Sequence, residues 1–227
     1  MNIEINPKKV LIGFLSIISF LLIANLIGVI SKNHFNYNYF LNPFFDFDTE
    51  RNIPTLYSSV AIIICSILLS IIAIIHKRRN ESFIPWVGLS LIFLFLAIDE
   101  TAQIHERFSD PTRVTLDTPE EGLLRFAWII PYGIASLIFL ITYLRFLIRL
   151  PKKTMKLFIL SGGIFVLGAI GFEALGGLPI LWSNRTIYGL VLTCEELLEM
   201  VGIAFFIYTL ISYITNQFGK IKISISN

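Results

Sequence analysis

The chain is poor in the residues that form soluble surfaces and covalent cross-links. Of its 227 residues only 15% are charged, two are cysteine and three are histidine, whereas 55% are hydrophobic. So little charge excludes an ordinary soluble domain and indicates an integral membrane protein. Two thiols, Cys65 and Cys194, cannot form a disulfide or zinc framework, and we interpret them as packing residues within predicted spans.

Segments of about ten alternating apolar and polar residues are also missing, which excludes an outer-membrane barrel. Lipid offers no partner for free backbone groups, so the long apolar runs are predicted to be helices. The sequence therefore predicts an all-α fold, a single transmembrane domain over residues 1–227. Its six spans lie near residues 10–30, 54–76, 84–104, 123–147, 157–179 and 188–213. The first span lacks a small-x-small cleavage site, and we expect it to be retained as a helix.

Positive charge is distributed unevenly between the two sides of this predicted bundle. With the N-terminus in the cytoplasm, twelve Lys and Arg lie inside and six lie outside or at the outer boundary. Because cytoplasmic loops carry the excess of Lys and Arg, both termini are predicted to be cytoplasmic. The acidic residues have the opposite distribution, since only Glu4 and Glu81 lie inside. Any functional face is therefore expected outside the cytoplasm. The net charge of only +2 argues against nucleic acid, and the lipid bilayer is the expected partner.

Several carboxylates fall inside the predicted spans, where an ionisable group costs roughly 2.5–3.5 kcal/mol near the helix centre. At 1.5 Å per residue, Glu195 lies roughly 10 Å below the outer end of the sixth span. A cluster of buried acids persists only if it is paired, protonated, hydrated or bound to a cation, so we expect a functional site here. The candidate metal ligands are Asp99, Glu100, His105, Glu173, Glu195, Glu196 and Glu199.

Helical spacing suggests how these groups face one another. A continuous third helix would align Asp99, Gln103 and Glu106 in one stripe and leave His105 well round to the other side. His105 is either a wet interfacial residue or, beside the carboxylates, a ligand or proton relay, because histidine combines a near-neutral pKa with a nitrogen donor. The candidate catalytic residues are Glu100, His105 and Glu196. The candidate rim or gating residues are Gln103, Glu106, Arg125 and Tyr188.

Two residues of the fourth span have open interpretations. Arg125 either neutralises part of the acidic cluster or anchors its helix at the interface. Pro131 is expected to kink this helix and open room at that depth.

The first outer loop, residues 31–53, is aromatic and acidic. Its alternating Asp46, Asp48 and Glu50 resemble the start of a calcium loop, but the required glycine and the downstream bidentate Glu are missing. We interpret its aromatic residues as interfacial and its acids as solvated, with the loop as a potential lid over the site.

Three motifs together resemble those of an uncharacterised family of bacterial six-helix integral membrane proteins. They are Asp46-x-Asp48-x-Glu50 with Ile53-Pro54-Thr55, Asp99-Glu100-x4-His105-Glu106, and Glu195-Glu196-x-x-Glu199. The resemblance spans most of the chain and implies a multi-pass protein of the bacterial plasma membrane. It implies no activity, substrate or cofactor.

Three functions are compatible with these residues. A metal-dependent enzyme acting on a lipid-like or membrane-delivered substrate would use the carboxylates and His105 to hold Mg, Mn, Ca or a carboxylate-bridged di-iron centre. A cation- or proton-coupled transporter or channel would use Glu199, the deepest acid, as its coupling residue. A structural or accessory subunit would use the acids only to join helices, at about 0.6 kcal/mol per interhelical hydrogen bond. No serine or cysteine nucleophile motif adds a fourth.

Overall fold

The computed structural model describes residues 2–35, 37, 40–219 and 222–224. Six segments in this part of the chain are long and apolar enough to span a membrane, which confirms the predicted all-α, multi-pass architecture. They are α1 (Pro7–His34), α3 (Ile53–Arg78), α4 (Ile84–Ala102), α7 (Ile129–Leu147), the continuous segment α8 (Lys152–Val166), η1 (Leu167–Phe172) and α9 (Glu173–Gly176), and α11 (Arg185–Phe218). The short elements are α2 (Asn42–Phe45), α5 (Ile104–Arg107), α6 (Ser109–Leu116), α10 (Pro179–Trp182), β1 (Asn2–Glu4) and β2 (Lys222–Ser224).

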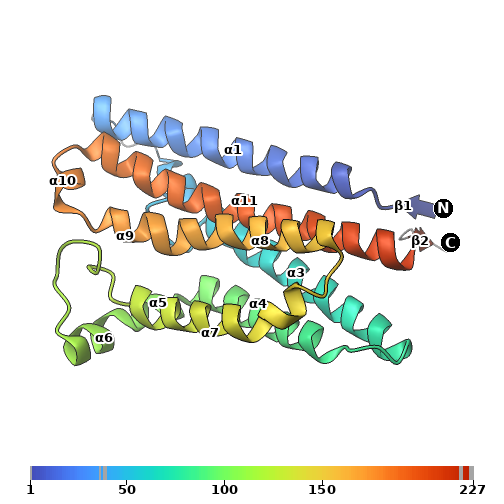
Figure 1. Ribbon diagram of the computed structural model, residues 1–227. Coiled ribbons are helices and arrows are strands. Elements are labelled where there is room, and N and C mark those ends of the chain that lie inside the picture. Colours follow the sequence, from blue (N-terminus) through green and yellow to red (C-terminus); the bar gives the residue numbers. More distant parts are fainter. Residues whose placement is uncertain (1, 36, 38–39, 220–221, 225–227) are drawn as a thin grey trace.

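The chain termini lie together at one end of the bundle (Figure 1). The two short strands pair antiparallel there, with Asn2 opposite Ser224. We call this end the terminal end and the opposite end, which carries α5, α6 and α10, the site end. An even number of spans requires both termini on one side, as the sequence predicts; the cytoplasmic assignment of that side stays a prediction.

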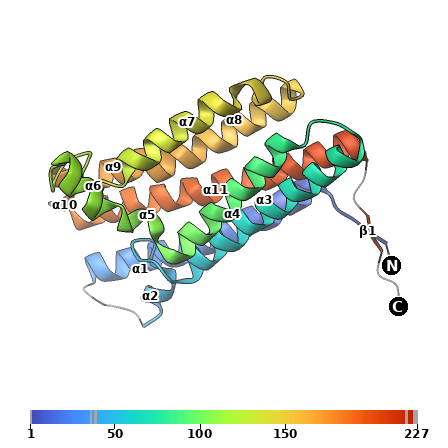
Figure 2. The ribbon, with the colours of Figure 1, turned by 90° about the horizontal axis from the view of Figure 1, so that it is seen from below.

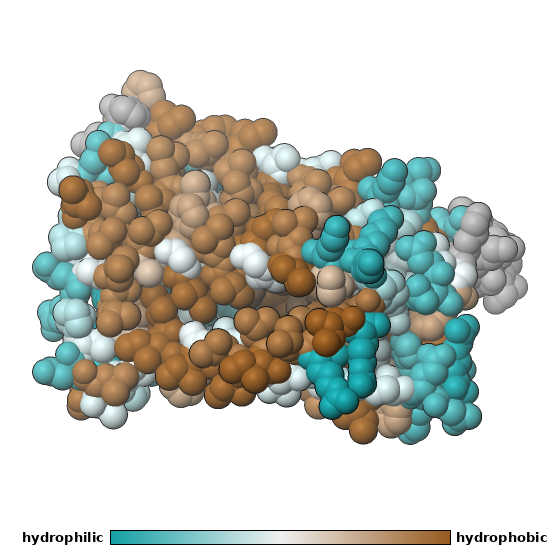
Figure 3. All heavy atoms as spheres, in the orientation of Figure 1, coloured by the Kyte–Doolittle hydropathy of each residue, from teal (hydrophilic) through white to brown (hydrophobic). Residues whose placement is uncertain are grey.

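Helix α11 is the centre of the bundle. It packs against α1, α3 and the α8–η1 segment, while α3 and α4 form an antiparallel hairpin (Figure 2). In its most apolar stretch 67% of the residues are buried, against 6% in α7. Hydrophobic side chains form a broad band across the visible face, and hydrophilic ones gather toward its two ends (Figure 3). Helix α7 is therefore the span with the most surface left for lipid.

Asparagine caps fix where three of the spanning helices begin. The side-chain oxygens of Asn6, Asn52 and Asn184 accept hydrogen bonds from backbone N–H groups in the first turns of α1, α3 and α11. Such caps satisfy donors that have no partner inside the helix. Asn52 thereby ends the first outer loop and holds Glu50 three residues before the start of α3 at Ile53.

The structure differs from the sequence-based expectation in the fourth span. Helix α7 begins at Ile129 instead of near residue 123, and the segment before it forms turns. Pro131 consequently lies in the first turn of the helix, where proline is well tolerated because its missing N–H would have had no helical partner. The prediction that Pro131 kinks this helix is wrong, because the helix begins only two residues before the proline.

Candidate functional site

The site end is organised by a break in the backbone after α4. Helix α4 ends at Ala102, and Gln103 takes a left-handed conformation, with φ 53° and ψ 44°, before the single turn of α5. The backbone N–H of His105 donates to Oδ1 of Asp99 at 2.7 Å, and His105 Nδ1 lies 3.4 Å from the same oxygen. The predicted stripe of Asp99, Gln103 and Glu106 on one continuous helix is therefore wrong. The left-handed conformation of Gln103 brings His105 back over Asp99.

Three side chains come together beside this break. Glu50, His105 and Glu106 each offer a ligand atom, and these atoms all lie within 4.8 Å of one another. Among the residues that the structure describes, no other group of His, Cys, Asp and Glu meets this condition. Glu106 is exposed, while Glu50 and His105 are partly buried. This arrangement matches a cation site built from two carboxylates and an imidazole.

Glu50 is the member of this group that sequence reasoning missed. It was interpreted as a solvated loop acid, yet it lies at the start of α3, where its Oε2 accepts a hydrogen bond from the Thr55 hydroxyl at 3.3 Å. The available signal was its place in the Asp46-x-Asp48-x-Glu50 motif. Hydropathy placed the residue outside the membrane and could not show that the loop folds back over the site.

Charge and burial shift the titration of the two partly buried members. Burial raises the pKa of Glu50, as does Glu106, and the attraction of His105 only partly opposes this. Burial lowers the pKa of His105, but the adjacent Asp99 carboxylate, with Glu50 and Glu106, outweighs burial and raises it overall. The imidazole is thus surrounded by negative charge that a divalent cation would neutralise.

Aromatic side chains from the start of α7 form one wall of the site. The His105 ring lies 4.7 Å from the Trp128 ring and 6.2 Å from the Tyr132 ring, measured between centroids. Trp128 Nε1 donates to Oε1 of Glu173 at 3.2 Å, so this indole connects the two predicted site residues. The Tyr132 hydroxyl is buried and interacts with the Asp99 carboxylate. The wall is therefore mostly apolar, with one hydroxyl group directed to the site.

The deeper carboxylates lie on α11 beside a π-helical turn. A Cβ atom at Gly168 in η1 would lie 2.8 Å from the Glu195 carbonyl oxygen and 3.0 Å from Glu199 Cγ, so only glycine allows this approach. The π-helix widens the segment next to Glu173, a feature that recurs at functional sites. One carboxyl oxygen of Glu195, Oε2, is buried without a partner. Glu195, Glu196 and Glu199 are each partly buried at this contact.

Electrostatic interactions connect the deep acids with the ligand group. Glu196 interacts with Glu50, Glu173 and His105. Glu199 interacts with Glu196 and Glu100. The structure thus brings all the predicted candidates into one acidic region, although Asp99, Glu100, Glu173, Glu195, Glu196 and Glu199 do not join the compact group of ligand atoms.

The predicted rim residues have separate roles. Arg125 stacks its guanidinium 4.2 Å from the centre of the Trp182 ring and forms no ion pair within the described parts of the chain, which favours an interfacial anchor. Gln103 contributes the backbone break. Tyr188 interacts electrostatically with Asp48 of the loop and with Glu195.

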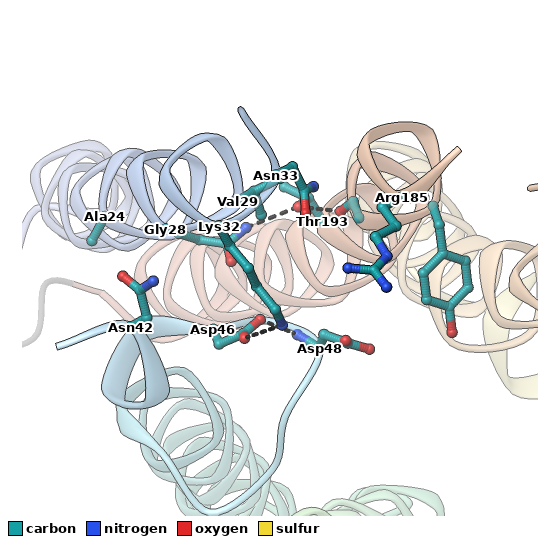
Figure 4. A pocket seen from close by; sticks show the side chains of 13 residues that line it. Ala24, Gly28, Val29, Lys32, Asn33, Asn42, Asp46, Asp48, Arg185 and Thr193 are labelled. Atoms are coloured by element: carbon teal, nitrogen blue, oxygen red, sulfur yellow. Dashed lines mark hydrogen bonds and ion pairs between the residues drawn. The ribbon is translucent and has the colours of Figure 1, made fainter. Parts of the chain in front are cut away.

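A pocket of about 270 Å³, lined in part by Tyr188 and by several charged side chains, lies between α1, the first loop and α11 (Figure 4). Lys32 approaches Asp46 at 3.9 Å, and the side chains of Arg185 and Asp48 also face this space. Asn25, which is 2% exposed, donates to Thr193 and accepts from the backbone N–H of Phe47, so the loop is tied to both helices. Burial raises the pKa of Asp48. A lid movement of this loop stays a prediction.

Fold and site together define a multi-pass membrane protein with a carboxylate- and histidine-containing region at one end of its helix bundle. The chain belongs to the family described as Domain of unknown function (DUF8692), which matches residues 14–213. This range contains every candidate site residue and reaches into all six spans. No curated protein and no solved structure matches the chain. The expected family resemblance is confirmed in its extent and its six helices, and family membership assigns no activity.

Proposed function

We propose that the site end binds a divalent cation between Glu50, His105 and Glu106, as part of a metal-dependent enzyme acting on a lipid-like or membrane-delivered substrate. The observation that carries this proposal is the convergence of three ligand atoms within 4.8 Å, from residues 55 positions apart in the sequence. Two carboxylates and one imidazole suit a cation of intermediate hardness such as Mn²⁺, Fe²⁺ or Zn²⁺.

The position of Asp99 supports the same proposal. Asp99 is 5% exposed and lies 3.4 Å from Nδ1 of His105, while Nε2 has no hydrogen-bond partner among the described residues. Histidine ligands commonly donate one ring N–H to a carboxylate, which fixes the ring orientation and makes the other nitrogen a better ligand. We assign Asp99 to this orienting role and Nε2 to the cation.

A cation at this position would polarise a substrate oxygen or activate a water molecule. Three protein ligands leave coordination positions open for both. Glu100 and Glu196, which interact electrostatically with this group, could accept the proton released by such a water.

Metal analysis of detergent-purified protein tests this proposal. After growth in medium supplemented with Mn, Fe and Zn, the wild type is expected to carry about one equivalent of one of these metals. The variants Glu50→Gln and His105→Ala should lose it. Glu81→Gln is the matched control, because Glu81 contacts a histidine, His76, at the opposite end of the bundle. Absence of saturable binding, or equal binding by all four proteins, would overturn the proposal.

A second candidate function is a cation- or proton-coupled transporter. It is supported by the series of mutually interacting carboxylates that runs from Glu50 through Glu196 to Glu199. Beyond Glu199 the path meets closely packed apolar side chains, since Ile207 and Leu210 are at most 1% exposed. A proton-flux assay in liposomes with Glu199→Gln separates the two functions. Flux in the wild type that the variant loses would favour transport.

A further inference from the structure

A second, larger cavity lies between α4, α7, α8 and α11, toward the terminal end from the acidic site. Its volume is about 610 Å³, within the range of small-molecule sites. Its walls are almost entirely aliphatic and aromatic, and no charged residue lines it. Two of the three hydroxyl groups in the wall already have partners within the protein, since Tyr143 donates to the Pro85 carbonyl and Ser161 to the Leu157 carbonyl. A ligand here would therefore be bound through hydrocarbon contacts.

The cavity begins one helical turn from the acids on three of its walls. Leu96 lines it four residues before Glu100, Ile203 lies four residues after Glu199, and Ile170 lies three residues before Glu173. Residues three or four apart share one face of a helix, separated by about 5.4 Å along the axis. In each pair the apolar residue lies on the side of the terminal end. The apolar cavity therefore lies next to the acidic site, on its terminal-end side.

The cavity is elongated and bordered by a loosely packed helix. Its lining on α7 runs from Gly133 to Leu147, about 21 Å at 1.5 Å per residue, against roughly 30 Å for a bilayer hydrocarbon core. Cβ atoms at Gly133, Gly162 and Gly163 would meet no atom within 4 Å, so these glycines widen the cavity. Because α7 is mostly unburied, the cavity borders the bilayer along this helix.

We infer that this cavity holds one hydrocarbon chain of a membrane lipid, whose head group reaches the acidic site. The charges of the protein match a molecule with a polar head and an apolar chain. The acids lie at the site end, and no acid lines the apolar cavity. The inference rests on the proposed function for the role of the head group, which would offer an ester or phosphate oxygen to the cation. It assigns the substrate class as a lipid and orients it along α7.

Photolabelling in nanodiscs of phosphatidylcholine tests the inference. The probe is a palmitic acid that carries a diazirine midway along its chain, and labelled positions are mapped by peptide mass spectrometry. Saturable labelling is expected on α7 and α8, at cavity-lining residues such as Phe139, Tyr143 and Phe165. Excess unlabelled palmitic acid should compete with it. Uniform, non-saturable labelling of all lipid-facing helices would overturn the inference, as would cross-linking that shows a second protein chain in the cavity.

Glycine variants provide matched controls. Gly162→Phe on α8 should lower saturable labelling by about tenfold or more, because the phenyl ring would occupy space that the hydrocarbon chain needs. Gly133→Phe on α7 is a second variant with the same expectation. Gly13→Phe on α1 should have no effect, since its Cβ also meets nothing within 4 Å but lies outside the cavity. Equal labelling of all three variants would contradict the assignment.

Metal analysis of the same samples separates the two proposals. Gly162→Phe is expected to keep the metal, because it changes no ligand. Saturable labelling without any bound metal would overturn the metal-dependent function and leave the chain-binding cavity in place. Bound metal with non-saturable labelling would overturn the chain-binding cavity and leave the metal site in place.

Discussion

His76 and His105 lie at opposite ends of the α3–α4 hairpin and have neighbours of the same kinds. Each packs against a tryptophan, with ring centroids 5.6 Å apart for His76 and Trp86 and 4.7 Å apart for His105 and Trp128. Each has a carboxylate oxygen near Nδ1, at 2.6 Å from Glu81 and at 3.4 Å from Asp99. Their side chains are also similarly buried, at 13% and 17% exposed.

The two histidines differ in the hydrogen-bond partner of their second ring nitrogen, Nε2. Nε2 of His76 lies 2.9 Å from the Tyr213 hydroxyl, and the ring also packs against Phe218, so this imidazole is fully engaged within the protein. Nε2 of His105 has no such partner in the described structure, and His105 belongs to the group with Glu50 and Glu106. Burial and the types of neighbouring residue therefore do not distinguish the two histidines. They differ in Nε2, which is hydrogen-bonded in His76 and has no such partner in His105 among the described residues.

The largest expected effect comes from replacing His76, the histidine at the terminal end. His76→Ala removes a hydrogen bond and three ring contacts, and we expect it to lower the free energy of unfolding by about 2–4 kcal/mol. His105→Ala should cost less, because its side chain makes two ring contacts and its contact with Asp99, at 3.4 Å, is longer than the 2.6 Å contact of His76 with Glu81. Thermal unfolding in detergent without added metal measures both. A larger loss for His105→Ala would contradict the structural role given to His76.

The next effect compares the two carboxylates beside Nδ1. Asp99→Asn should lower metal affinity by about 10–100-fold while leaving the metal stoichiometry at saturation unchanged, since orienting partners of histidine ligands have effects of this size. Glu81→Gln should leave affinity unchanged. Competition titration with a chelator measures the affinities. Complete loss of stoichiometry in Asp99→Asn would mean that Asp99 is itself a ligand and not a positioning residue.

A smaller effect concerns the contact between η1 and α11. Gly168→Ala would place a methyl group 2.8 Å from the Glu195 carbonyl oxygen, and because backbone on both sides must move, we expect a loss of about 1–3 kcal/mol. Gly163→Ala, five residues earlier, meets no atom within 4 Å and should be neutral or stabilising by up to about 1 kcal/mol. Equal unfolding temperatures for the two variants would show that η1 is not held against α11.

Hydropathy was sufficient to predict the six spans, because burial in lipid demands long apolar helices. It also found the acids on α11, since their cost in a span is visible in the sequence. It could not place Glu50 beside His105, because that contact depends on how a loop folds back. Nor could it show the π-helix at Leu167–Phe172 or the left-handed Gln103, since both are local backbone irregularities set by tertiary packing. The site lies where helical periodicity fails.

The smallest expected effect compares the turns at the two ends of the hairpin. Asn80, at the terminal end, and Gln103, at the site end, both have positive φ, at 56° and 53°. Asparagine tolerates this conformation better than glutamine, for which it costs roughly 1 kcal/mol or more. Gln103→Gly should therefore stabilise the protein by about 1 kcal/mol, whereas Asn80→Gly should change stability by only a few tenths. Thermal unfolding of both variants provides the measurement. If Gln103→Gly instead lowered both stability and metal affinity, the glutamine side chain would have a role at the site beyond its backbone conformation.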